Sequence, residues 1–160
     1  MALASFLTTA QTITGAHSDF VALITEANFL NANAGALDGS TFANGGGNVI
    51  IYTDATKTTQ VPIEVVRFST GGTPSVQIWA KHPSMQTSAT FHIEADETQT
   101  VQPPVNSTFG RNAVWSNIEY VFHFNQNNKH VNSTGNYSLT DGCSTNLGSG
   151  GAFGSTASHT

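Results

Sequence analysis

The sequence predicts an all-β protein, an antiparallel β-sandwich of jelly-roll type with extended arms at both ends. Short runs of alternating polar and apolar residues, rich in β-branched and aromatic side chains, predict strands. Gly, Pro and Asn separate these runs at the spacing typical of sandwiches and barrels. We expect an N-terminal arm over residues 1–14, the sandwich over 15–125 and a polar Gly/Ser/Asn-rich C-terminal arm over 126–160.

Six segments have the composition and boundaries of strands. They are residues 19–25 (DFVALIT), 48–53 (NVIIYT), 61–68 (VPIEVVRF), 75–81 (SVQIWAK), 89–95 (ATFHIEA) and 119–124 (EYVFHF). A further short run at 137–140 is a candidate strand. Residues 22–30 have some apolar residues at helical spacing, but their β-branched and aromatic content leaves helix and strand both open. We expect at most one or two short helical turns.

The alternation within the predicted strands separates a buried face from a solvated one. In segment 75–81 the apolar face comprises Val76, Ile78 and Ala80, and the opposite face comprises Gln77, Trp79 and Lys81. In segment 89–95, Phe91 and Ile93 point one way and the polar residues between them point the other way.

The chain has few charged residues, and this composition argues against some classes of function. Only 9% of the residues are charged, against roughly a quarter in ordinary soluble domains. The five Lys and Arg residues and the net charge of −5 argue against nucleic acid, whose binding depends on neutralising phosphates. No run approaches the roughly 20 apolar residues that span a bilayer, so we expect no membrane association.

The N-terminus has no Lys or Arg before Lys57 and therefore lacks the basic region of a secretory signal. We expect synthesis in a cytoplasm without signal-peptide export. The single Cys143 cannot close a disulfide within the chain, and no basic residue nearby activates it.

Catalytic and metal-binding patterns are missing from the sequence. The six histidines show no short His-x-His or His-x3-His spacing, so no metal or cofactor is expected. A glycosidase pair could be drawn from the acidic residues Asp54, Glu64, Glu94, Asp96 and Glu97, but the cluster at 94–97 is more typical of a solvated strand end. The glycine run 45–47 lacks the Lys of a phosphate loop and predicts a flexible turn. We therefore expect no enzyme.

Trp79, with Gln77 and Lys81 on its predicted face, is the leading candidate for binding a partner or stacking on a sugar. The alternative is that Trp79 packs in the core beneath a loop or a second sheet. Trp115 is a second candidate, either closing the end of the sandwich or contacting another subunit. Arg111, four residues earlier, completes the set of candidate interface residues.

Several segments resemble a known family. They are Asp19-Phe20-Val21, residues 47–54 (GNVIIYTD), 61–65 (VPIEV) and 76–84 (VQIWAKHPS). Together they resemble a β-sandwich domain family of unassigned function, found in phage virion proteins and large bacterial secreted proteins. Segment 76–84 matches the family's aliphatic-x-aliphatic-Trp-x-Lys-x-Pro signature, and the resemblance covers about residues 15–95.

A second resemblance begins where the first one ends. Residues 109–115 (FGRNAVW), 120–124 (YVFHF) and 132–136 (NSTGN) resemble the junction and opening of a laminin-G-like or concanavalin-like module. The chain departs from the pattern at residues 94–97 (EADE), where the family has a Tyr-Tyr-Gly-type element. The second module also stops after its first segment, which suits chain-to-chain contact better than carbohydrate binding.

These resemblances imply a non-enzymatic structural protein of a bacteriophage virion: a capsid decoration (cement) protein, a head-fibre base or a small tail-associated protein. The expected partners are further copies of the chain, in a homo-oligomer such as a trimer, and other virion proteins such as a major capsid protein. The alternative is a phage adhesin, a carbohydrate- or receptor-binding module acting through Trp79. A glycoside hydrolase is a third, less favoured option.

Overall fold

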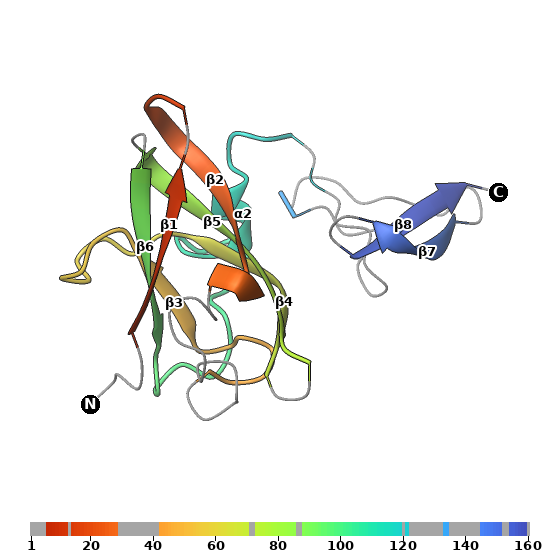
Figure 1. Ribbon diagram of the computed structural model, residues 1–160, viewed down its shortest axis with the longest axis horizontal. Helices are drawn as coiled ribbons and strands as arrows, with labels where there is room; N and C mark the ends of the chain where they lie inside the picture. Colours follow the sequence, from red (N-terminus) through yellow and green to blue (C-terminus); the bar gives the residue numbers. More distant parts are fainter. Residues whose placement is uncertain are drawn as a thin grey trace. The chain divides into compact units, whose positions relative to one another are not determined.

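The protein is mostly β-strand, and its strands pair antiparallel (Figure 1). The computed structural model describes residues 6–12, 14–28, 42–70, 73–85, 88–119, 121, 133–134, 145–151 and 154–159. The chain divides into two compact units, Met1–Val114 and Trp115–Thr160. The all-β class predicted from the sequence is confirmed.

The first unit contains two three-stranded sheets. One has the order β1 (Phe6–Thr12), β6 (Ser88–Ala95), β3 (Val49–Tyr52), and the other has the order β2 (His17–Thr25), β5 (Ser75–Met85), β4 (Ile63–Ser69). A short helix, α2 (Arg111–Val114), packs on β4 and β5. Residues 26–28 form one more helical turn, so the expectation of only short helical segments is confirmed for the described residues.

The two sheets are formed by the same three stretches of chain in the same order. Strands β1 and β2 follow each other, as do β5 and β6, and the pairing passes from Thr12↔Ser88 in one sheet to His17↔Met85 in the other. Figure 1 shows the end of β1 and the start of β2 at the same end of the unit as the end of β5 and the start of β6. The two sheets therefore arise from one antiparallel ribbon that folds over, with β5 and β6 as its central strand.

One hydrophobic cluster is shared by both sheets. Ile24 of β2, Ile78 of β5, Ile51 of β3, and Phe91 and Ile93 of β6 are all fully buried in it. Each such side chain contributes about 1.5–3 kcal/mol relative to an exposed one. The predicted inward faces of segments 75–81 and 89–95 are confirmed, because Val76, Ile78, Ala80, Phe91 and Ile93 all belong to the cluster.

Strand β5 is longer than the predicted segment 75–81, because it continues through residues 82–85. Pro83 has no N–H to donate, and its opposite position is Asp19, which has a left-handed φ of 53°. The register of β2 and β5 accordingly omits this one pair, between Ser18↔Ser84 and Phe20↔His82. A proline is tolerated where the ladder has no bond to lose.

The predicted arms also contain strands. The segment expected as an N-terminal arm over 1–14 includes β1, which is paired along its whole length with β6. The segment expected as a C-terminal arm includes an antiparallel hairpin of β7 (Thr145–Gly151) and β8 (Gly154–His159). The predicted strand at 119–124 lies largely outside the described residues, and Glu119 and Val121 are not in a strand. The candidate strand at 137–140 lies outside them entirely.

Candidate interaction surface

Trp79 lies in the middle of a sheet rather than at its rim. The register places it opposite Leu23 on β2 and Glu64 on β4. Trp79 is half-buried and lies outside the core cluster, and Glu64 is only 6% exposed. Trp79 therefore lies on the sheet face that points away from the core cluster, between Leu23 on one neighbouring strand and Glu64 on the other.

Gln77 and Lys81 occupy the same strand at two-residue spacing from Trp79, as the alternation predicted. Gln77 is 9% exposed. The Nζ of Lys81 lies 3.4 Å from Oδ1 of Asp19, and its backbone N–H donates to the carbonyl of Pro62 at 3.2 Å. This ion pair links β5 to β2.

The other two candidates, Arg111 and Trp115, do not lie on these strands. Arg111 opens α2, and its Nε is buried without a hydrogen-bond partner among the described residues. Trp115 begins the second unit, is 5% exposed, and its carbonyl accepts the N–H of Ile118 at 2.8 Å. Trp115 is buried and presents no open aromatic face, whereas Trp79 is partly exposed.

The loop from Ala95 to Arg111 contains a feature that the sequence analysis missed, a set of side-chain amides that clamp it to the rest of the first unit. The Nε2 of Gln99 donates to the carbonyl of Gly47 at 2.8 Å. The Nε2 of Gln102 donates to the carbonyls of Gly46 at 2.6 Å and Val49 at 3.1 Å. These bonds join segments about fifty positions apart in the chain, so the loop has a defined conformation.

Two glycines let the backbone come close enough for this clamp. A Cβ on Gly47 would lie 2.2 Å from the carbonyl oxygen of Thr100, and a Cβ on Gly110 would lie 2.1 Å from that of Pro104. Only glycine fits at such approaches. The glycine run 45–47, expected to be a flexible turn, is therefore in part a packing surface, which is a correction to that expectation.

The clamped loop presents apolar side chains to solvent. Val101 is 73% exposed and Val105 is 48% exposed, and the two prolines between them are half-buried and exposed. We call residues 101–105 (VQPPV) the valine loop. Proline restricts the backbone and the amides anchor it, so docking of a partner here costs little conformational entropy.

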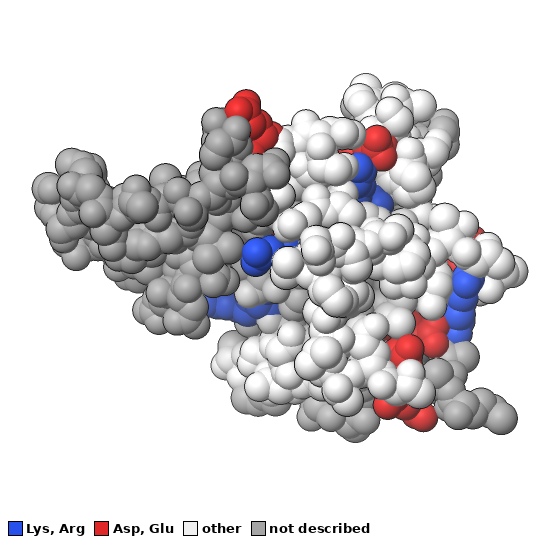
Figure 2. All heavy atoms as spheres, turned by 180° about the vertical axis from the view of Figure 1, so that it is seen from behind, with Lys and Arg blue, Asp and Glu red and all other residues white. Residues whose placement is uncertain are grey.

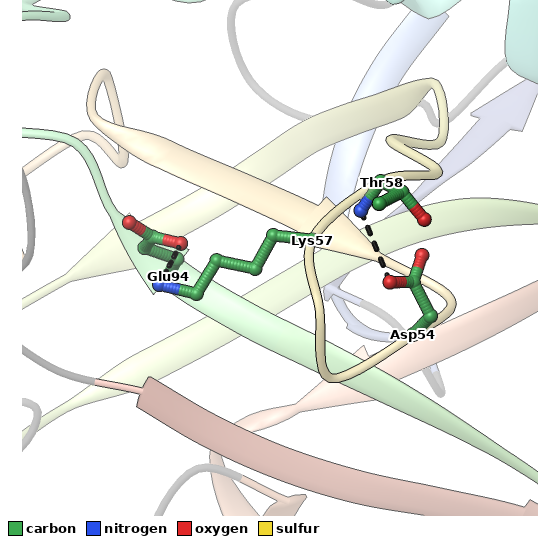
Figure 3. Close-up of polar contacts among 4 residues, drawn as sticks. All are labelled: Asp54, Lys57, Thr58 and Glu94. Atoms are coloured by element: carbon green, nitrogen blue, oxygen red, sulfur yellow. Dashed lines mark hydrogen bonds and ion pairs between the residues drawn. The ribbon is translucent and has the colours of Figure 1, made fainter.

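Charge is sparse around these features. Figure 2 shows small, scattered groups of Lys, Arg, Asp and Glu on a described surface that is otherwise uncharged. One pair is largely buried: Nζ of Lys57 lies 3.0 Å from Oε2 of Glu94, which is 5% exposed. Figure 3 shows Lys57 extending from its loop to reach Glu94 on β6. The sequence analysis favoured a solvated strand end for residues 94–97, and for Glu94 this expectation is wrong, because its side chain is buried and paired with Lys57.

The carboxylate of Asp54 accepts hydrogen bonds from its own turn. Oδ1 of Asp54 accepts the N–H of Thr58 at 3.0 Å, and Oδ2 accepts the N–H of Thr59 at 2.8 Å (Figure 3). These bonds, led by the one from the Thr56 hydroxyl, hold the pKa of Asp54 well below its usual range. Burial, then the charge of Glu94, raises the pKa of the neighbouring Tyr52. This arrangement fixes the loop between β3 and β4.

Within the described residues, no three His, Cys, Asp or Glu side chains are grouped so as to hold a metal ion. Cys143 and His130 lie outside those residues. No helix in the described part of the chain is both long and apolar enough to cross a membrane.

The chain was compared with family models, curated proteins and solved structures, and nothing in any of the three matches it.

Proposed function

We propose that this chain is a non-enzymatic structural protein of a bacteriophage virion, a capsid decoration (cement) protein or a head-fibre or tail-associated protein, that works by docking on neighbouring subunits. The family resemblance of residues 76–84 supports the phage assignment. The observation that carries the docking role is the valine loop, two exposed valines on a backbone clamped by Gln99 and Gln102.

A rigid apolar projection suits attachment to a lattice. Burial of apolar surface contributes about 25 cal/mol per Å², so two valines supply a modest energy for one copy. Repetition of the contact by a homo-oligomer, such as a trimer, on a repeating capsid multiplies that energy through effective concentration. The proposed partners are therefore further copies of this chain and a major capsid protein, with assembly in the host cytoplasm.

The proposed architecture is a jelly-roll sandwich. Two findings support it: both three-stranded sheets contribute to one core cluster, and the same chain segments pass from one sheet to the other in the same order. This topology presents loops such as the valine loop at the ends of the strands, where subunits of a lattice can reach them.

Particle localisation tests the proposal. Virions assembled with and without the chain are imaged, and density for the chain is expected at regular positions on the particle. Particles without it are expected to release their genome at lower temperature. Absence of the chain from purified virions would contradict the proposal.

The second candidate function is a carbohydrate- or receptor-binding module, and the half-buried Trp79 among Gln77 and Glu64 favours it. A glycan array with the purified chain distinguishes the two functions. Binding that is lost in Trp79→Ala, with the fold retained, would favour the adhesin.

A further inference from the structure

Strand β1 lies at the edge of its sheet, and we propose that it pairs antiparallel with β1 of a second copy of this chain about a two-fold axis. The pairing makes one continuous sheet from two three-stranded ones. The inference rests on the proposed function, because it specifies the self-association which that function requires. It specifies a two-fold dimer, where a trimer was given above as an example.

The other sheet edges of the first unit carry features that obstruct strand pairing. Beyond β3, the returning chain occupies the edge, since Tyr52 bridges to Gln60 and the N–H of Val61 donates to the carbonyl of Ile51 at 2.9 Å. Strand β4 has a register shift between Val65 and Arg67. Bulges, charges and covering segments are the usual protection of edge strands.

Strand β2 is protected by a change of conformation and by charge. Asp19 has a left-handed φ of 53° in the strand and pairs with Lys81 at 3.4 Å. A partner strand laid along β2 would meet both the irregular backbone and the exposed carboxylate.

Within the part of the chain that the structure describes, strand β1 shows none of these devices. Its seven residues, FLTTAQT, include no charged residue and no proline. Its register with β6 runs without a shift from Phe6↔Glu94 to Thr12↔Ser88. A regular uncharged edge of this length is a template for another strand.

A second copy of β1 is the occupant that fits this edge best. The whole chain carries a net charge of −5, so an uncharged edge is where two copies can meet at the lowest electrostatic cost. A two-fold antiparallel pair requires one residue to face its own copy, and all seven residues pair when that residue is Thr9. Thr8 then lies opposite Ala10 of the second copy, twice in each dimer. The pair is self-complementary and closed, as an isologous interface must be.

Two double variants test both the pairing and its register. The register places Thr8 and Ala10 opposite His92 and Thr90, which are half-buried, whereas Thr9 is opposite the fully buried Phe91. Thr8→Lys with Ala10→Lys puts like charges opposite each other at both positions of the dimer. Thr8→Lys with Ala10→Glu puts opposite charges there instead.

The full-length chain and both variants are compared by sedimentation and light scattering, with circular dichroism and thermal melting to confirm the fold. We expect a dimeric wild type, a retained dimer for Lys/Glu, and a dissociation constant at least about tenfold higher for Lys/Lys. Added salt should strengthen the wild-type dimer by screening its net charge.

A monomeric wild type, equal dissociation of both variants, or no effect of either would overturn the inference. These outcomes are separate from those of the proposed function. A dimer that is absent from virions would leave the pairing of β1 standing, and a monomer found on virions would leave only lattice docking.

Discussion

Gly47 shows how one residue without a side chain determines the position of a whole loop. Its carbonyl accepts the amide of Gln99, and its Cα faces the backbone of Thr100. Its neighbour Gly45 differs, because it has a positive φ of 87° but a Cβ added there would meet nothing within 4 Å. Gly47 is therefore required because a side chain would not fit, whereas Gly45 is favoured because of its backbone conformation.

We expect Gly47→Ala to lower the free energy of unfolding by about 3 kcal/mol, because the methyl group displaces the loop backbone. Gly45→Ala is the matched control and should cost about 1 kcal/mol, the penalty of a left-handed alanine. Urea unfolding of both variants measures the difference. Equal losses would show that the loop can move away from Gly47 without cost.

His82 makes stability depend on pH. It is 8% exposed, its Nδ1 accepts the N–H of Ser84 at 3.2 Å, and its ring meets Phe91 edge-on. Burial lowers the pKa of His82 below its ordinary value, so the folded state favours the neutral ring. The contribution of the neutral His82 ring to the free energy of unfolding is therefore complete at pH values above the unfolded-state pKa of about 6.5. This contribution is lost as the pH falls through the lower pKa of the folded state.

We expect the free energy of unfolding of the wild type to decrease between pH 8 and pH 5 more than that of His82→Asn. Asparagine keeps an acceptor near Nδ1 but does not titrate, so the difference between the two curves isolates His82. Parallel curves would mean that the other titrating groups account for the whole pH dependence.

At the scale of elements, β5 is the central strand of its sheet, and the chain continues from it into β6, the central strand of the other sheet. Ile78 pairs with Ile24 on β2 and Val65 on β4 and is fully buried. A large-to-small change there removes contacts to both neighbouring strands and leaves a cavity. The loss should exceed that at any exposed valine.

We expect Ile78→Ala to destabilise the fold by about 3 kcal/mol, measured by chemical unfolding. Val101→Ala, at a side chain 73% exposed, should stay within about 0.5 kcal/mol of the wild type. A large effect of Val101→Ala would mean that the valine loop is part of the core and is not available for docking.

At the scale of the whole molecule, the proposed docking and the stability of the chain depend on different residues. Val101→Asp combined with Val105→Asp should reduce occupancy on virions at least about tenfold, since each change places a charge in an apolar contact. Thr108→Asp is the matched control, because Thr108 is exposed outside the valine loop. Quantitative mass spectrometry of purified particles measures occupancy, and unchanged thermal midpoints confirm the fold. Equal occupancy for all three proteins would place the docking surface elsewhere.

Much of the fold could be predicted from local pattern. The segments that contain β2 to β6 were all recognised, and the inward faces of β5 and β6 were correct, because alternation at period two records which face is buried. The candidates Gln77, Trp79 and Lys81 were correctly placed on one strand. Phe42 is fully buried against Phe68, with ring centroids 5.8 Å apart, yet it lies outside every predicted strand. An isolated aromatic residue has no periodic pattern that would indicate its burial.

The sequence by itself determined the all-β class, most of the strands and the scarcity of charge, since these follow from composition and short-range spacing. Only the tertiary structure decided that β1 joins β6, that Lys57 neutralises Glu94, and that Gln99 and Gln102 hold the valine loop outward. Each of these contacts joins residues far apart in the chain. Such contacts depend on how the ribbon folds over, and no local pattern of residue types records that.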